Sequence, residues 1–278
     1  MAAKPDEETC MDYHLKEKVV LVTGAGSGIG AEVARAFCRE EATTIFVDID
    51  EQGLEAALAG YEEWGSPMVC DVSNAREVED LFARIRAKYG ALHVLVNSAA
   101  VCKAAYVQDI EEEDLERAFA VNMKGYVYTT MQAVPLMKAA HYGRLIYINS
   151  ASGLKASAGL AVYSASKYFD RGFAIAAALE VGRHNITSNS ICPSDVYPEG
   201  SREARSWCEK TLLQISLEKE EVRTFEELKQ KRTARNPMRR SCTAMDVAAL
   251  ALFLASEQAG FINGQSVGLN GGALPWGG

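Results

Sequence analysis

The sequence lacks the cysteine and histidine spacings that build metal centres or disulfide frameworks. Its seven cysteines are scattered over 278 residues without a C-x-x-C pair. The four histidines lie far apart, with no spacing typical of metal ligands. An odd number of cysteines without a framework favours reduced thiols in a cytosolic protein. We therefore expect no metal and no disulfide scaffold.

Long apolar runs and an excess of positive charge are also missing. No apolar run approaches the roughly 20 residues that span a bilayer. Residues 1–14 are polar and lack the apolar segment of a signal peptide. The net charge of −8 and the pI near 5.2 argue against a nucleic-acid or anionic-membrane partner. We expect a cytoplasmic protein with a flexible leader over residues 1–15 and neither kind of partner.

What is present is an alternation of short apolar runs with helix-periodic segments. Expected strands cover residues 18–23, 43–47, 68–70, 92–96, 144–148, 186–191 and 266–269. Expected helices cover residues 30–39, 52–59, 75–89, 114–137 (as one or two helices), 161–182 and 245–255. Repeated β-α units predict an α/β fold with a doubly wound parallel sheet of the Rossmann type, in a single domain over residues 16–278.

One stretch breaks this alternation. Residues 197–240 are charged and helix-prone, and no strand is visible there. An insertion of this size in an α/β domain is typical of a helical substrate lid at the C-terminal edge of the sheet. The alternative is a pair of solvated surface helices that only pack against the domain.

A glycine-rich turn follows the first expected strand. Residues 23–30 read T-G-A-G-S-G-I-G, between an expected strand and an expected helix. Glycines let the backbone turn tightly and approach a pyrophosphate, and the helix N-terminus then faces the phosphates. The alternative is a plain tight turn. The candidate cofactor contacts here are Gly24, Ser27, Gly28, Ile29 and Gly30.

Asp48 ends the second expected strand, 20 residues beyond Gly28. A carboxylate at this place can accept hydrogen bonds from the adenosine ribose hydroxyls and would repel a 2′-phosphate. Positions 27, 49 and 50 carry no basic residue, which favours NAD over NADP. The alternative is that Asp48 or Asp50 caps the next helix, and Asp50 suits that role.

Tyr163 and Lys167 are four residues apart, so on a helix they share one face. A phenol with a pKa of about 10 is a poor base at neutral pH, but a neighbouring ammonium favours its ionised form. Ser150, thirteen residues upstream of the tyrosine, offers a hydroxyl for a reacting oxygen. These residues suit proton transfer to an oxygen that gains or loses a hydride. The alternative is a half-buried tyrosine beside a solvated lysine.

In combination and in order, these motifs resemble the short-chain dehydrogenases/reductases of the classical type. Further matching pieces are Asp71-Val72, N-S-A-A at 97–100, Asn122, Pro193, Gly264 and Gly271-Gly272. The resemblance covers residues 16–196 and 237–272. The chain departs from the family at 97–100, where N-N-A-G is usual, and after Pro193, where Ser194 replaces glycine and Pro198 replaces a threonine.

The resemblance implies interconversion of a secondary alcohol and a ketone by hydride transfer, with NAD as the cofactor. Tyr163 would be the general acid/base, Ser150 would hold the substrate oxygen, and Lys167 would bind the nicotinamide ribose and lower the Tyr163 pKa. Asn122 would distort its helix and hold a water for proton relay. The implied cofactor contacts outside the turn are Asp48, Asp71, Val72, Asn97, Ala99, Tyr163, Lys167, Pro193 and Val196.

The substrate is less defined. Lys103, Ser152 and Lys155 are the candidate substrate contacts and point to a sugar acid, a sugar phosphate or a polyol. A hydroxysteroid or another hydrophobic alcohol is the alternative, and the lysines then are surface residues. A silent NAD-binding regulator, an epimerase and a dehydratase are further alternatives. The family also implies a homotetramer, or a homodimer, built through residues 103–138 and 161–182, and an Ala-rich face on the second of these segments fits close packing.

Overall fold

The computed structural model of the protein describes residues 13–197 and 210–274. Most of the expected leader, the first part of the expected lid (198–209) and the last four residues of the chain lie outside them. A seven-stranded parallel sheet has the order β3-β2-β1-β4-β5-β6-β7. Its strands are β1 (Val19–Thr23), β2 (Thr43–Asp48), β3 (Gly65–Val69), β4 (Val94–Asn97), β5 (Gly143–Ile148), β6 (Ile186–Pro193) and β7 (Ser266–Leu269). The α/β doubly wound fold is confirmed.

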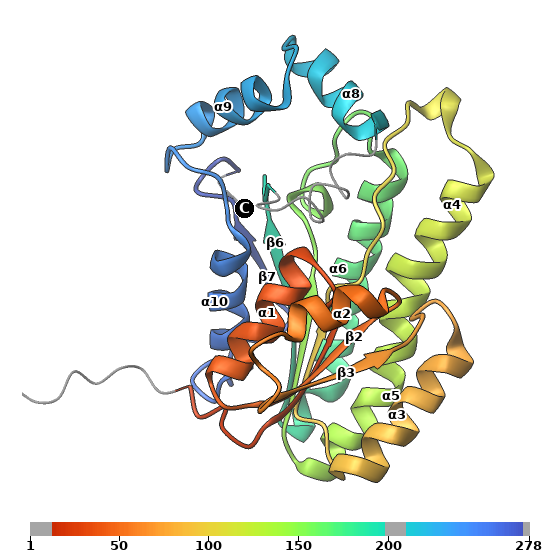
Figure 1. The fold of residues 1–278 in the computed structure, drawn as a ribbon, viewed down its shortest axis with the longest axis vertical. Helices are drawn as coiled ribbons and strands as arrows, with labels where there is room; N and C mark the ends of the chain where they lie inside the picture. The colour runs from red at the N-terminus through yellow and green to blue at the C-terminus, as the bar shows by residue number, and fades with distance from the viewer. Residues whose placement is uncertain (1–12, 198–209, 275–278) are drawn as a thin grey trace, which may run out of the picture.

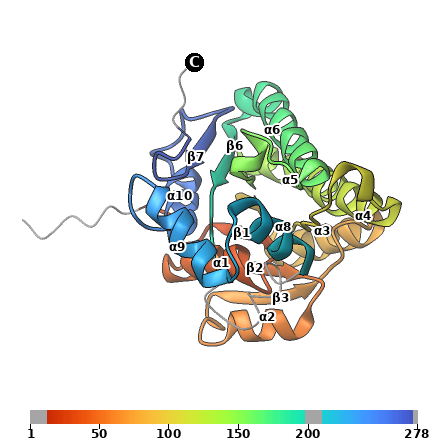
Figure 2. The ribbon, with the colours of Figure 1, turned by 90° about the horizontal axis from the view of Figure 1, so that it is seen from above.

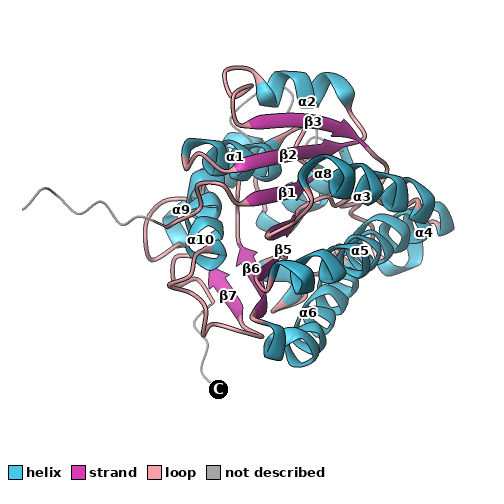
Figure 3. Ribbon diagram, turned by 90° about the horizontal axis from the view of Figure 1, so that it is seen from below, coloured by secondary structure: helices cyan, strands magenta, loops and turns pink. Residues whose placement is uncertain are grey.

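Helices cover both faces of this sheet (Figures 1 and 3). One core lies under α1 (Gly28–Arg39), α2 (Glu51–Leu58) and α10 (Ala244–Ala255), and the other lies under α3 (Ala75–Tyr89), α5 (Gly125–Ala140) and α6 (Ala161–Val181). Alternate β1 residues face opposite cores, since Val20 and Val22 join the first core and Val19 and Leu21 the second. Burial on both faces explains why this strand is uniformly apolar.

The segment 114–137, expected as one or two helices with a distortion at Asn122, forms α4 (Glu112–Ala118), a π-helical turn (Phe119–Lys124) and α5. The extra residue per turn places Asn122 inward, where its amide bonds another segment. Strand β3 begins three residues before the predicted start, because Gly65 and Pro67 suit an edge strand although they are poor strand formers.

The carboxyl ends of β1 and β4 form the point where the strand order reverses. Thr23 at the end of β1 ties the two loops together, because its Oγ1 accepts hydrogen bonds from the N–H groups of Ser98 and Ala99 at 3.1 and 3.2 Å. Gly24 has φ +68°, and a Cβ there would lie 2.8 Å from the backbone of Ala99. Clefts at such reversal points are the usual ligand sites of open α/β sheets.

In the described part of the segment between β6 and α10, two helices lie beyond this edge of the sheet (Figures 1 and 2). They are α8 (Lys210–Glu220) and α9 (Phe225–Arg235). Ile215 of α8 is buried and packs in a small apolar cluster with Ala104 and Leu160. Arg232 of α9 forms an ion pair of 3.4 Å with Asp195, which follows β6. This segment therefore contacts the loops after β4, β5 and β6.

The outer face of α6 carries several exposed apolar side chains. Three of the four alanines expected to form a subunit contact, Ala174, Ala177 and Ala178, are buried within the chain. Leu179 is 84% exposed, and Ile175, Tyr168 and Phe169 are also exposed. Within the described ranges, no helix is both long and apolar enough to cross a bilayer.

Candidate functional site

The four predicted catalytic residues converge at the C-terminal edge of the sheet. Tyr163 and Lys167 share one face of α6, with the Lys167 Nζ 5.9 Å from the centre of the phenol ring. Asn122 reaches the same helix, because its Nδ2 donates to Ser166 Oγ at 3.0 Å. The same amide pairs with both backbone groups of Val101 at 2.8 and 2.9 Å. Asn122 thus fixes the loop after β4 against the helix that carries the tyrosine.

Ser150 lies at the start of the loop between β5 and α6. Its Oγ accepts a hydrogen bond from the N–H of Ser152 at 3.0 Å. The neighbouring Asn149 anchors this loop, because its Nδ2 donates to the Lys167 carbonyl at 2.9 Å and its Oδ1 accepts from the Ser150 N–H at 2.7 Å. Asn149 therefore sets where the Ser150 hydroxyl stands relative to α6.

Burial dominates the acid–base properties of Tyr163. It raises the pKa of the phenol to about 12. The charge of Lys167 lowers this pKa, as the sequence predicts, and so does a hydrogen bond with Ser150, but neither outweighs burial in the protein without cofactor. The phenol is therefore protonated at neutral pH, which suits it as a proton donor to a ketone oxygen.

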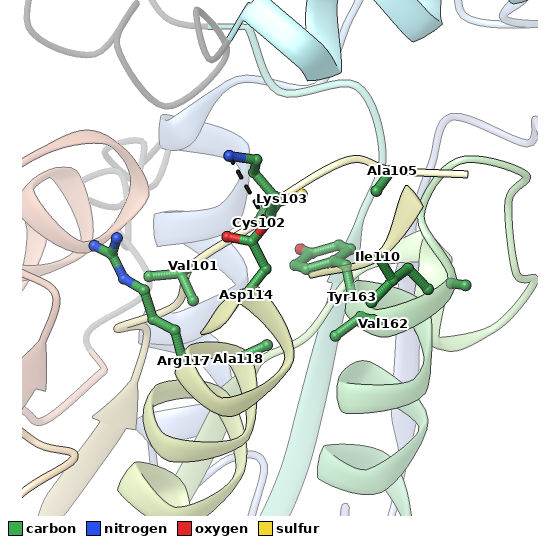
Figure 4. A pocket seen from close by; sticks show the side chains of 11 residues that line it. Val101, Cys102, Lys103, Ala105, Ile110, Asp114, Arg117, Ala118, Val162 and Tyr163 are labelled. Carbon is green, nitrogen blue, oxygen red and sulfur yellow. Dashed lines mark ion pairs between the residues drawn. The ribbon is translucent and has the colours of Figure 1, made fainter. Parts of the chain in front are cut away.

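A cavity of about 70 Å³ adjoins the Tyr163 ring, between α4 and the start of α6 (Figure 4). Most of its lining residues are apolar, and its charged side is formed by Lys103, Asp114 and Arg117. Lys103 Nζ lies 3.8 Å from Asp114 Oδ2. Of the predicted substrate contacts, Lys103 thus lines the cavity. Lys155 is exposed and outside its lining, and the backbone N–H of Ser152 bonds Ser150.

The glycine turn forms a close-packed cradle at the N-terminus of α1. A Cβ at Gly30 would lie 2.1 Å from the Gly24 carbonyl oxygen, so only glycine lets the helix start this close to the turn. Gly28 has φ +54°. Ser27 is the N-cap residue but makes no side-chain capping hydrogen bond. Its hydroxyl and the helix N-terminus are therefore suited to an anion. Ile29 packs against the core.

Asp48 stands beside this cradle and is part of it. Its Oδ2 accepts from the Gly26 N–H at 2.9 Å, and its Oδ1 accepts from the Asp50 N–H at 3.0 Å. The helix-capping role falls to Asp50, which accepts from the Gly53 N–H at 3.1 Å at the start of α2. The carboxylate of Asp48 thus remains at the edge of the turn, where an adenosine ribose would lie.

The remaining predicted cofactor contacts lie at or after the ends of strands β3, β4 and β6. Asp71 accepts from both the N–H and the hydroxyl of Ser73, and Val72 packs beside Gly125. Asn97 is buried, and its amide bonds Thr129 and Thr130 of α5. The Asn97 side chain therefore serves packing in this structure. The remaining three, Ala99, Pro193 and Val196, lie after or at the ends of β4 and β6.

These residues fit a dinucleotide. The cradle would hold the pyrophosphate, Asp48 the adenosine ribose, and Lys167 with Tyr163 the nicotinamide ribose. The fit rests on the glycine positions that a Cβ would fill and on an uncapped helix start beside a carboxylate. The individual roles remain predictions.

Three polar residues at the site escaped the sequence interpretation. Asp170 and Tyr126 contact the Lys167 ammonium, and Asn149 anchors the Ser150 loop. Asp170 had a visible signal, since an acid three residues after a lysine on a helix is placed to pair with it. Nothing in the sequence reveals that this pair is buried.

Comparisons with known proteins agree with this geometry. Residues 18–209 match the model of the short chain dehydrogenase family. A D-beta-hydroxybutyrate dehydrogenase of Cupriavidus necator is 32% identical over 93% of this chain and 98% of its own. A 3beta-hydroxysteroid dehydrogenase of Mediterraneibacter gnavus is 31% identical over 92% of this chain and 94% of its own.

A solved structure is also similar. A variant of actinorhodin polyketide ketoreductase, crystallised with NADPH, superposes with a TM-score of 0.85 at 30% identity. The match covers 94% of this chain and 98% of that one. The chain belongs to the short chain dehydrogenase family of oxidoreductases, whose members bind a nicotinamide cofactor.

Proposed function

We propose that the protein is an NAD-dependent oxidoreductase that interconverts a secondary alcohol and a ketone. The observation that supports this most directly is that Ser150 and Lys167 meet at Tyr163, which lines a cavity. The loop after β4, which packs against the glycine cradle at Ala99, lines the same cavity with Val101. NAD is favoured over NADP because Asp48 stands at the adenosine ribose position and would repel a 2′-phosphate. The similar ketoreductase structure with NADPH makes this preference a point to test.

The proposed mechanism uses three side chains. The bound nicotinamide supplies the hydride acceptor or donor. In the reducing direction, Ser150 donates a hydrogen bond to the carbonyl oxygen and Tyr163 delivers its phenol proton to that oxygen. Lys167 stabilises the resulting phenolate by its charge. In the oxidising direction, the Tyr163 phenolate accepts the hydroxyl proton of the alcohol.

The proposed substrate is a polar alcohol such as a sugar acid, a sugar phosphate or a polyol. Lys103, Asp114 and Arg117 give the cavity beside Tyr163 a charged side, which an apolar substrate would have to desolvate. A hydroxysteroid is the second candidate, because the other cavity walls are apolar and a relative is a 3beta-hydroxysteroid dehydrogenase. In this proposal, residues 16–278 form one domain, and segment 197–240 is a lid that closes over the substrate.

The Tyr163→Phe variant tests the mechanism. It removes the proton donor and keeps the ring, so turnover should fall by at least about a hundredfold while NADH binding is retained. Tyr61→Phe is the matched control, because the Tyr61 hydroxyl accepts from the exposed Arg39 and lies away from the site. The assay follows NADH absorbance across sugar acids, sugar phosphates, polyols and hydroxysteroids.

Its outcomes separate the alternatives. Turnover by Tyr163→Phe at the wild-type rate would refute the mechanism. NADH binding by the wild-type protein without turnover of any alcohol or ketone would favour a silent NAD-binding regulator. Product formation without net NADH formation would favour an epimerase or a dehydratase.

A further inference from the structure

Asp170 is a fully buried carboxylate next to the predicted active site. It lies one helical turn after Lys167 on α6, and its Oδ2 is 3.1 Å from the Lys167 Nζ. The two side chains are 0% and 1% exposed. Its other oxygen, Oδ1, has no hydrogen-bond partner within the part of the chain that the structure describes. Burying a charged carboxylate costs desolvation free energy unless an opposite charge pairs with it, so Asp170 needs a cationic partner.

The Lys167 ammonium is held by three protein oxygens. Its Nζ donates to Asp170 Oδ2, to the Ile148 carbonyl at 3.1 Å and to the Tyr126 hydroxyl at 3.3 Å. These three contacts fix the orientation of the ammonium, and a ribose hydroxyl that binds it would take the place of one of the two neutral oxygens. Asp170 is the charged member of this set, and the other two oxygens are neutral.

The surroundings of Asp170 leave Lys167 as its counter-ion. The titratable groups that face it are Lys167 on its own helix, Tyr126 on α5 and Tyr147 on β5. Burial raises the pKa of both tyrosines, so both are neutral at physiological pH. Burial also raises the Asp170 pKa, to about 6, which leaves the carboxylate charged at neutral pH.

We infer that Asp170 is a positioning residue, the counter-ion that keeps the buried Lys167 protonated and oriented toward Tyr163 and the cofactor ribose. The inference rests on the proposed function for the part that Lys167 plays. Burial lowers the Lys167 pKa, and the Asp170 charge contributes most to reversing that direction, with smaller contributions from Tyr163 and Cys102. Without the charge, Lys167 should lose its proton within the range where the enzyme works, and with it the ability to donate to a ribose hydroxyl.

The experiment measures NADH affinity between about pH 6 and about pH 9 in wild type, Asp170→Asn, Lys167→Gln and the double variant. The wild-type NADH affinity should show no titration of Lys167, because the pKa of this lysine is raised. For Asp170→Asn, the NADH dissociation constant should rise by about tenfold between about pH 6 and about pH 9. Lys167→Gln should bind weakly at every pH, and adding Asp170→Asn to it should change nothing further. Glu180→Gln, on the exposed face of α6, is the control for charge removal on the same helix.

The outcomes discriminate as follows. A pH-independent NADH affinity for Asp170→Asn that equals the wild type would overturn the inference, and so would further weakening in the double variant. If Asp170→Asn does not fold but the double variant does, Asp170 is the counter-ion of Lys167, because only the unpaired charge was harmful. If neither variant folds, Asp170 serves the fold itself and the inference is wrong. If wild type binds no NADH, the proposed function fails as well.

Discussion

The Asp48 carboxylate accepts a hydrogen bond from the Gly26 backbone N–H at 2.9 Å, so the acid proposed to bind the ribose and the glycine turn form one unit. A Cβ at Gly26 would lie 2.9 Å from Asp48 Cγ, which explains why this position of the turn has no side chain. The contact fixes the carboxylate at the mouth of the cradle. The proposed preference for NAD therefore rests on the turn as well as on the acid.

Asp48→Asn should weaken NADH binding and reduce the ratio of NADH affinity to NADPH affinity. The substitution keeps the shape of the side chain and removes its charge, so ribose hydrogen bonds lose about 1.5–3 kcal/mol, or about ten- to a hundredfold in affinity. Quenching of tryptophan fluorescence by each dinucleotide measures both constants. Asp50→Asn, which alters the cap of α2, is the control. Tighter wild-type binding of NADPH than of NADH would contradict the assignment.

The two reaction directions should depend differently on pH. In the proposed mechanism, alcohol oxidation needs the Tyr163 phenolate, and burial raises the pKa of this phenol to about 12 without cofactor. Below the pKa, the phenolate fraction rises about tenfold per pH unit, so oxidation should accelerate with pH. Ketone reduction uses the protonated phenol, which predominates below the pKa, so it should stay nearly constant from neutral to mildly alkaline pH.

The measurement is the initial rate in each direction as a function of pH. A deuterated alcohol shows whether hydride transfer limits the rate, because a slow product release would conceal the titration. An oxidation rate that stays constant with pH while the deuterium effect is fully expressed would exclude Tyr163 as the titrating base. If the rise of the oxidation rate occurs at lower pH with cofactor bound, the cofactor has added positive charge beside the phenol and lowered its pKa.

Ile215→Ala should raise the KM for the substrate and leave NADH affinity unchanged. Ile215 packs against Ala104, and a Cβ at Gly159 would lie 2.6 Å from its Cγ2, so this side chain joins α8 to two loops near Tyr163. Truncation should loosen the proposed lid, with a KM increase of about tenfold and a free energy of unfolding lowered by about 2 kcal/mol or less.

Lys219→Ala, at an exposed position of the same helix, is the control for this experiment. Steady-state kinetics and thermal denaturation distinguish a local from a global effect. If the Ile215→Ala protein shows the wild-type KM and only a lower Tm, the α8–α9 segment packs against the domain without closing over the substrate. That result would support the surface-helix interpretation of residues 197–240.

The elements that depend on local signals could be predicted from the sequence. Helix α3 has its predicted bounds, because Asn74 caps its start and Gly90 ends it with φ +74°. The π-helical turn at Asn122 could not be predicted from local signals, because its amide bonds Val101, a residue distant in sequence. The same holds for Asp170: its spacing to Lys167 is visible in the sequence, but its burial depends on α5 and β5.

The outer face of α6 leads to a prediction about assembly. Tyr168, Ile175 and Leu179 are exposed and follow helical spacing, so they form one apolar stripe on this helix. Met131 of α5 is also exposed, at 60%. Stripes of this kind usually mark subunit contacts, so we expect a homotetramer or a homodimer in which α6 is covered. This contact would use the exposed stripe, because three of the alanines face the core of their own chain.

Leu179→Arg should therefore shift the protein toward smaller assemblies in size-exclusion chromatography with light scattering. A guanidinium at the centre of an apolar contact has no partner, and its desolvation opposes association by several kcal/mol per copy. NADH affinity should stay within about twofold of wild type, since Leu179 is exposed and lies about three helical turns beyond Lys167 on α6. Glu180→Lys, which changes the charge of the neighbouring exposed residue, is the matched control. A wild-type protein that is monomeric at micromolar concentration would rule out the stripe as a subunit contact.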